Sequence, residues 1–324
     1  MENSAKTFFG LIILTLFILT DNNVLAQSDP MKVIFETDLT LDVDDVGALA
    51  VLHGLQTEGK VNLLGVCYNE VHPLASNVID AINTYYHHGT IPIGIYRTDL
   101  KEPDPSDYFT SERNFDVDNM RHDPFDNIVA DAVAVYKHIL KSQADNSVVI
   151  ISVGFLNNLN DLLKDPEGFE LVKRKVKLLA VMGGLNNDGF NFTRHDLVDQ
   201  TQYVLENWPG TLVTTQVGGD MITGETLTST TPIHNPVRRA YELEWHQGPS
   251  IGRSSWDQVT VLYAVYGTKY FNEEWNGSGS LKNDYTWTFS KDIRGYAAPN
   301  NDKEVENEIE RLMTINPPIN PLKK

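Results

Sequence analysis

The sequence predicts an α/β fold with a mostly parallel, open sheet and helices on both of its faces. Short, wholly apolar runs suit strands that are buried on both sides, and helical patterns alternate with them along the chain. The apolar runs cover 33–35, 62–67, 91–95, 147–153, 176–182 and 211–216, and the helical patterns cover 46–55, 74–86, 125–142, 157–163 and 201–207. In open α/β sheets, ligands bind where the loops leave the carboxyl ends of the strands. We therefore expect the functional residues to lie in the loops that follow the apolar runs.

The N-terminus has the pattern of an export signal. Lys6 precedes an apolar run over 8–19 that is short for a membrane span, and Val24-Leu25-Ala26 offers small residues at the expected cleavage positions. We expect residues 1–26 to be a signal peptide and 27–324 to form a single exported domain, periplasmic or secreted. A retained N-terminal anchor is the alternative.

Charge and cysteine usage restrict the partners. The formal net charge is −18, which repels polyphosphate backbones and excludes nucleic acid as a partner. Cys67 is the only cysteine, so no internal disulfide forms, and its place in an apolar run favours a buried, inert thiol. We expect a small-molecule partner and no membrane contact after signal cleavage, and we leave assembly into a homo-oligomer open.

An acidic loop follows the first predicted strand. Glu36, Asp38, Asp42, Asp44 and Asp45 lie within ten residues of one another, and their mutual repulsion is costly unless a cation lies among them. Carboxylates at a strand end suit Ca²⁺ or Mg²⁺. The alternative is a helix N-cap, which explains one or two acids but not five. A phosphatase with an Asp-x-Asp nucleophile is a third reading, and the glutamate at the nucleophile's position argues against it.

Five motifs occur in the order typical of one enzyme family. They are D-V-D-D at 42–45, L-L-G-V at 63–66, G-F-L-N-N-L at 154–159, V-M-G-G at 181–184 and S-S-W-D-Q at 254–258. With them the chain resembles the inosine-uridine-preferring nucleoside hydrolase family over about 33–267, in a branch with an inserted D-V-D-D calcium loop. The resemblance implies a nucleoside-hydrolase-like fold and calcium-dependent hydrolysis of the N-glycosidic bond of a ribonucleoside or related ribosyl compound.

The resemblance also implies a calcium site. Asp38 would be both a calcium ligand and the catalytic base that activates water. Asp45 and Asp257 would ligate calcium through their carboxylates, and Val153 through its backbone carbonyl. Asp257 has a helix cap as its alternative role.

The remaining implied residues bind the substrate. Asp44 would hold the ribose 2′-hydroxyl, with Asp42 as the alternative. Asn191 would contact the ribose, although it also fits a turn or a glycan acceptor in Asn191-Phe192-Thr193. Asn69 and Met182 are assigned to the same substrate site, and His72 is an alternative to Asn69.

Departures from the family put the pocket for the 5′-hydroxyl, through Gly189, and the leaving-group side, through Trp256, in doubt. Gly189 replaces a family glutamate, and Trp256 replaces a histidine that protonates the departing base in some members. A tryptophan stacks on an aromatic base but supplies no useful proton, so His195 and Asp196 are the candidate acids. These departures also permit an exported, non-catalytic, calcium-dependent nucleoside- or sugar-binding protein. The segment 96–127 is either a surface excursion or a rim over the site.

Overall fold

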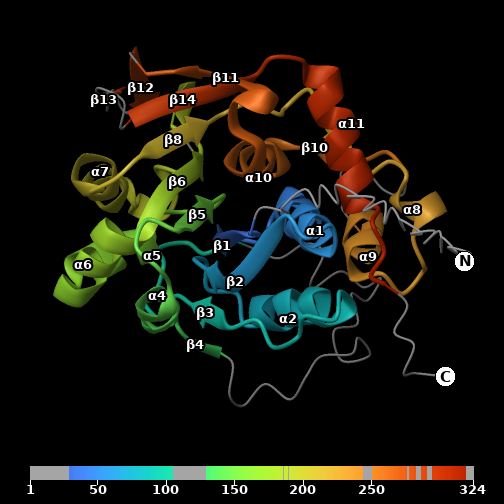
Figure 1. Ribbon diagram of the computed structural model, residues 1–324, viewed down its shortest axis with the longest axis horizontal. Helices are drawn as coiled ribbons and strands as arrows, with labels where there is room; N and C mark the ends of the chain where they lie inside the picture. The colour runs from blue at the N-terminus through green and yellow to red at the C-terminus, as the bar shows by residue number, and fades with distance from the viewer. Residues whose placement is uncertain are drawn as a thin grey trace, which may run out of the picture.

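The structure is a computed structural model that describes residues 29–104, 129–184, 186–188, 190–243, 250–275, 277–281, 286–289 and 294–318. A nine-stranded sheet runs through it (Figure 1). The strands lie in the order β11 (Phe271–Glu274), β14 (Arg294–Pro299), β8 (Leu212–Thr215), β6 (Val176–Met182), β5 (Val148–Ser152), β1 (Met31–Thr37), β2 (Val61–Tyr68), β3 (Ile93–Ile95) and β4 (Val129–Asp131). All neighbours pair in parallel except β11 and β14. The predicted fold class is therefore confirmed.

Helices cover both faces of this sheet, as Figure 1 shows. One layer holds α1 (Asp44–Thr57), α2 (Ala75–Tyr85), α9 (Pro236–Leu243), α10 (Trp256–Tyr266) and α11 (Asp302–Met313). The other holds α4 (Ala132–Ser142), α5 (Asn157–Lys164), α6 (Pro166–Lys175) and α7 (Val198–Asn207). Each layer buries its own apolar core against the sheet.

Smaller elements lie around the rim. They are β7 (Asn186–Asp188), β12 (Gly277–Leu281) and β13 (Thr286–Phe289) in a three-stranded sheet, β9 (Ile222–Thr223) paired with β10 (Arg253–Ser254), the short helix α8 (Leu227–Thr230), and the 3₁₀ turns η3 (Arg194–Asp196) and η4 (Gly267–Lys269). The antiparallel pair β9 and β10 leads directly into α10.

The central strand β1 shows how the sequence serves two cores. Val33 and Phe35 point into the core under α1, while Ile34 points into the core under α4 and α5. Because β1 lies between β2 and β5 and both of its faces are buried, its sequence is apolar without alternation. Glu36 is the exception. It lies on the face of Ile34 and is completely buried.

Most predicted elements are present, and one was wrong in type over part of its length. The predicted helix 125–142 begins only at Ala132, because Val129–Asp131 pairs with β3 as the edge strand β4. The Asp131 side chain accepts a hydrogen bond from the Ala134 amide at 3.1 Å and so caps the helix. Helix α6, the small elements β7 and η3, and the elements after β8 other than α10 were not predicted. Most of the segment 96–127 and all of residues 1–26, which are the predicted signal peptide, lie outside the described residues.

Two simpler expectations concern Cys67 and the membrane. Cys67 is buried and unpaired, as predicted. Within the described ranges, no helix has the length and apolar character needed to cross a bilayer.

Helix α1 carries a histidine that is buried in uncharged form. His53 is completely buried, stacks on Tyr86 with ring centroids 4.6 Å apart, and bonds through Nε2 to Asn83 Oδ1 at 2.9 Å. Burial is the main cause that lowers the pKa of His53 to about 3. Unfolding returns this side chain to water and an ordinary pKa near 6.5.

We predict that His53 makes the fold sensitive to acid. Between the two pKa values the unfolded chain binds more protons, so the contribution to stability is present above pH 6.5 and is lost as pH falls towards 3. From pH 7 to pH 5 this amounts to about 2 kcal/mol. His53→Gln keeps an amide that can donate to Asn83 but does not titrate. Urea unfolding at both pH values should therefore show the free-energy difference between wild type and variant shrinking by that amount. An equal difference in unfolding free energy at pH 7 and pH 5 would refute the assigned role of His53.

Candidate functional site

The loops that leave the carboxyl ends of β1, β5 and β6 meet the N-terminus of α10 at one edge of the sheet. Between them lies a cavity of about 380 Å³, a size that suits a small molecule. Its lining consists of Asp38, Leu41, Asp42, Asp44, Asp45, Val153, Met182, Phe190, Asn191, Arg253, Trp256 and Asp257. Every residue that the sequence assigned to calcium or substrate lines this cavity except Asn69.

Two helices direct their N-termini at the same point. Asp44 and Asp45 open α1, and Asp257 lies in the first turn of α10. These three buried carboxylates offer oxygens that all lie within 4.8 Å of one another. The positive ends of the helices offset part of their repulsion. Neither helix is capped by a side-chain hydrogen bond, so these acids do not serve as N-caps. Their position at the positive helix ends is the part of that alternative that the structure retains.

Asp38 completes the group from the end of β1 and is 8% exposed. The next loop passes close to it because position 154 is glycine. A Cβ there would lie 2.8 Å from Asp38 Oδ1 and 2.6 Å from Asn69 Oδ1, closer than atoms pack. The Thr37 hydroxyl, one residue earlier, donates to Asp45 and ties the strand end to α1.

Burial and neighbouring negative charges raise the pKa of all four carboxyls. Burial, followed by the charge of Glu70, raises the pKa of Asp38 to about 7. Burial, followed by the charges of neighbouring aspartates, raises the pKa values of Asp44, Asp45 and Asp257 well above the ordinary range. A divalent cation among these oxygens would relieve both effects. The available donors are the four carboxylates and the carbonyl of Val153, and a hard cation prefers such oxygen ligands. The residues present therefore fit a metal ion.

The other two acids of the loop do not belong to this group. Glu36 lies on the opposite side of β1, accepts a hydrogen bond from the Tyr136 hydroxyl at 3.1 Å, and has its pKa raised to about 8 by burial. Asp42 lines the cavity, but both of its oxygens bind the guanidinium of Arg253. The expectation that five acids gather around one cation was therefore too broad.

Asn191 joins the ends of β5 and β6. Its Nδ2 donates to the Val153 carbonyl at 2.6 Å and approaches the Met182 carbonyl at 3.3 Å. Asn191 is 3% exposed, and Phe192 beside it is fully buried. A glycan cannot reach this side chain in the folded protein, so the glycan-acceptor alternative is wrong. Val153 lines the cavity, and its carbonyl oxygen accepts the Asn191 amide. Its role as a metal ligand stays a prediction.

Asn69 lies behind the cavity wall. It is fully buried, its Nδ2 donates to the Phe155 carbonyl at 2.8 Å, and its Oδ1 points to the same space as Asp38 Oδ1. The structure thus places Asn69 beside the predicted base and not along the cavity. The alternative residue, His72, does not line the cavity either, and its Nδ1 accepts the Leu74 amide at 3.2 Å.

One wall of the cavity is aromatic and cationic. The Arg253 guanidinium lies 5.3 Å from the ring centre of Trp256. Phe190, which also lines the cavity, has the guanidinium of Arg194 4.5 Å from its ring centre, although Arg194 itself does not line the cavity. Sequence reasoning missed Leu41, Phe190 and Arg253. The sequence could have indicated two of them by their position next to predicted site residues. Arg253 directly precedes the S-S-W-D-Q motif, and Phe190 directly precedes Asn191.

Neither candidate acid lines the cavity. The Asp196 side chain is 74% exposed and pairs with Lys101 at 3.1 Å. The His195 side chain is buried, its Nδ1 donates to the Lys101 carbonyl at 2.9 Å, and its ring contacts Phe155 edge-on at 4.8 Å. Among the described residues that line the cavity there is no histidine.

No protein-family model matches the sequence, and no curated protein matches it. Solved structures do. The inosine-uridine preferring nucleoside hydrolase from Bacillus anthracis is 15% identical, with a TM-score of 0.65 over 88% of this chain and 99% of that one. The fold is that of the nucleoside hydrolases.

Two further structures agree with this fold. A plant nucleoside hydrolase, PpNRh1, is 16% identical, with a TM-score of 0.66 over 88% of this chain and 99% of its own. The type III effector protein XopQ, solved with adenosine diphosphate ribose, is 14% identical, with a TM-score of 0.67 over 89% of this chain and 94% of its own.

We predict that a divalent cation and the buried aspartates stabilise each other. Without metal, Asp257→Asn should unfold at a higher temperature than wild type, because it removes one repelling charge. With excess CaCl₂ the order should reverse, because wild type gains about 2.7 kcal/mol at a concentration of 100 times Kd and the variant gains little.

The measurement is a thermal melt in EDTA and in CaCl₂. Asp199→Asn, at an exposed acid on α7, is the matched control and should behave as wild type. Equal melting shifts in wild type and Asp257→Asn would show that these aspartates do not bind the ion.

Proposed function

We propose that this protein is an exported, calcium-dependent N-ribohydrolase that splits the glycosidic bond of a ribonucleoside or related ribosyl compound. One observation carries the proposal. Four buried aspartates converge on a cavity of small-molecule size that also presents the Asn191 amide and the Trp256 ring. Nucleoside hydrolases among the structural neighbours support the same reaction class.

The chemistry of N-glycoside cleavage suits such a cavity. The sugar ring becomes oxocarbenium-like as the bond to the base breaks, so positive charge develops at the anomeric carbon. Fixed carboxylates stabilise that charge without having to reorganise. A sugar held by its hydroxyl groups also brings the anomeric carbon to one place relative to the attacking water.

Four groups would hold calcium, namely the carboxylates of Asp38, Asp45 and Asp257 and the carbonyl of Val153. Calcium accepts six to eight oxygen ligands in flexible geometry, which suits this mixture better than the strict octahedron of magnesium. When bound, the ion supplies positive charge that positions hydroxyl groups and makes water easier to deprotonate.

Three side chains would act on the substrate. Asp38 accepts the proton of the attacking water, a role that favours a base whose pKa lies near the working pH. Asp44 accepts a hydrogen bond from the ribose 2′-hydroxyl. Asn191, beside Met182, contacts the ribose.

The leaving base meets Trp256, which stacks on an aromatic ring but does not protonate it. Arg253 also lines this wall, but the ordinary pKa of arginine is too high for it to act as an acid, and its guanidinium binds Asp42. The enzyme should therefore favour substrates whose leaving group departs without a proton.

Asp38→Asn is predicted to abolish turnover without unfolding the protein. The amide cannot accept the proton of water, and a lost general base costs about 10²–10⁴-fold in kcat. Single-turnover assays with p-nitrophenyl riboside and a melting curve for each protein provide the measurement. Asp196→Asn, at an exposed acid outside the cavity, should retain wild-type turnover.

Near-normal turnover by Asp38→Asn would exclude Asp38 as the base. Calcium-dependent binding of ribosides by the wild type without any turnover would instead identify the non-catalytic binding protein.

The ratio of activities on two substrates tests the leaving-group side. We expect p-nitrophenyl riboside to be hydrolysed at least 10²-fold faster than inosine, because only inosine needs a general acid. Trp256→Ala should raise KM for inosine because stacking is lost. Trp256→Phe keeps an aromatic ring and should raise KM less. Efficient hydrolysis of inosine that survives His195→Gln and Asp196→Asn would mean that another acid serves the cavity.

A further inference from the structure

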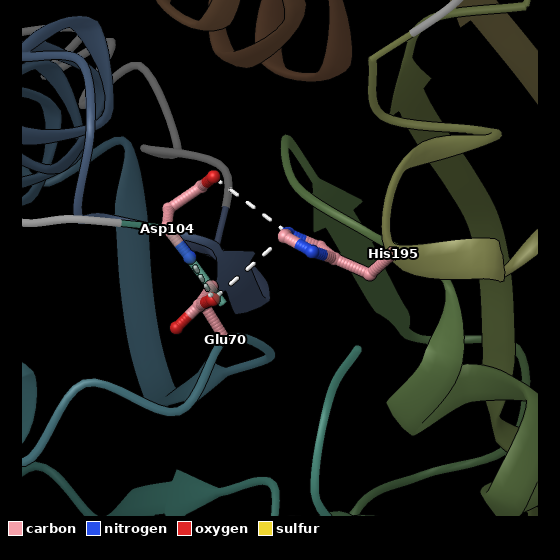
Figure 2. Close-up of side chains that lie close together, drawn as sticks. All are labelled: Glu70, Asp104 and His195. Carbon is pink, nitrogen blue, oxygen red and sulfur yellow. Dashed lines mark hydrogen bonds and ion pairs between the residues drawn. The ribbon is translucent and has the colours of Figure 1, made fainter. Parts of the chain in front are cut away.

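A second group of metal-ligating side chains lies outside the cavity. Glu70 follows β2, Asp104 lies in the loop after β3, and His195 lies in η3, and Figure 2 shows the three side chains pointing at one another. Their side chains are 0%, 2% and 1% exposed. One ligand atom from each lies within 4.8 Å of the other two.

The hydrogen bonds of the histidine fix which nitrogen faces the acids. Its Nδ1 donates to the Lys101 carbonyl at 2.9 Å, so in the neutral ring Nε2 carries a free lone pair. Nε2 is buried and has no hydrogen-bond partner. It points at Glu70 Oε1 at 3.9 Å and at Asp104 Oδ2 at 3.7 Å. Three electron-pair donors thus converge in a space from which water is largely excluded.

We propose that Glu70, Asp104 and His195 form a second metal site that takes a first-row divalent ion of the zinc or manganese type. An imidazole nitrogen with carboxylates is a ligand set for these metals, whereas calcium takes oxygen ligands. A ligand histidine usually donates its other N–H to a backbone carbonyl or carboxylate, as His195 does to Lys101.

The distances favour an ion over a shared proton. Separations of 3.7 and 3.9 Å are too long for N–H···O hydrogen bonds. Ligand atoms that each lie about 2.0–2.2 Å from one ion are roughly 3–4 Å apart. The cluster therefore needs little movement to bind the ion with these three ligands.

Neighbouring contacts hold the ligands in place. The Asp104 amide donates to Glu70 Oε1 at 2.9 Å, and the guanidinium of Arg194 pairs with the other oxygen of Asp104, Oδ1. Arg194 also lies over Phe190, which lines the substrate cavity. An ion at this site would fasten three loops and, through Arg194, one wall of the cavity.

Zinc binding to the whole protein in saturating CaCl₂ tests the site, since calcium occupies the aspartates. Equilibrium dialysis and elemental analysis should give about one zinc per chain for wild type. His195→Gln should weaken zinc binding by about 100-fold or more, since it removes the only nitrogen ligand. His138→Gln, at an exposed histidine of α4, and Asp196→Asn should leave it unchanged.

Asp104→Asn is the second variant if His195→Gln does not fold, and calcium-dependent melting shows whether each variant is folded. Cobalt(II) gives an independent readout, because visible absorption bands should appear in wild type and not in either site variant. The proposal is overturned if wild type binds no zinc with the metal in large excess. It is overturned equally if zinc binding falls with His138→Gln and survives both site variants, which would mark an adventitious surface site.

Discussion

Repulsion among four buried aspartates is the constraint on which the rest of this structure depends. Asp38, Asp44, Asp45 and Asp257 are held together from two helices and one strand, and nothing in their own chemistry favours that arrangement. Packing contacts of the surrounding helices and strands must therefore keep the four carboxylates together. Helices α1 and α10 pack on one another beneath a core that extends to α11, while β1 is fixed between parallel neighbours. Packing of the core thus offsets the destabilising repulsion of the carboxylates at the edge of the sheet, which is a pattern typical of functional sites.

The treatment of the other acids supports this interpretation. Glu36 is buried where its pKa is raised to about 8, so it is stored largely as a neutral acid at pH 7. The charge of Asp42 is balanced by the guanidinium of Arg253, which binds both carboxylate oxygens. The two acids of this loop that do not point to the proposed metal position are therefore compensated, Glu36 by protonation and Asp42 by the guanidinium of Arg253. Only the group that would meet a cation is left without an equivalent partner among the described residues.

The sequence predicted the edge of the sheet and most of its residues, because apolar runs mark parallel strands and strand ends mark the site. Prediction from the sequence failed where contacts with distant parts of the chain determine the structure. Residue alternation along β1 would have placed Glu36 on the face opposite Phe35, but the acids were counted by spacing alone. The pairing of Val129–Asp131 with β3 overrode a helical pattern. Glu70, Asp104 and His195 are far apart in the chain, so no local motif announces their meeting.

His195 shows how a structure changes the meaning of a residue. From the sequence it is a candidate acid for the departing base, since it lies in a loop near Asn191. In the fold, its Nδ1 is held by the Lys101 carbonyl and its Nε2 is turned to Glu70 and Asp104. A general acid must reach the atom that it protonates, and this ring does not line the cavity. The same buried nitrogen that disqualifies it from proton transfer makes it a metal ligand. In the proposed hydrolysis the cavity presents Trp256 where a proton donor would stand, so the rate enhancement would have to come from groups on the sugar side of the bond.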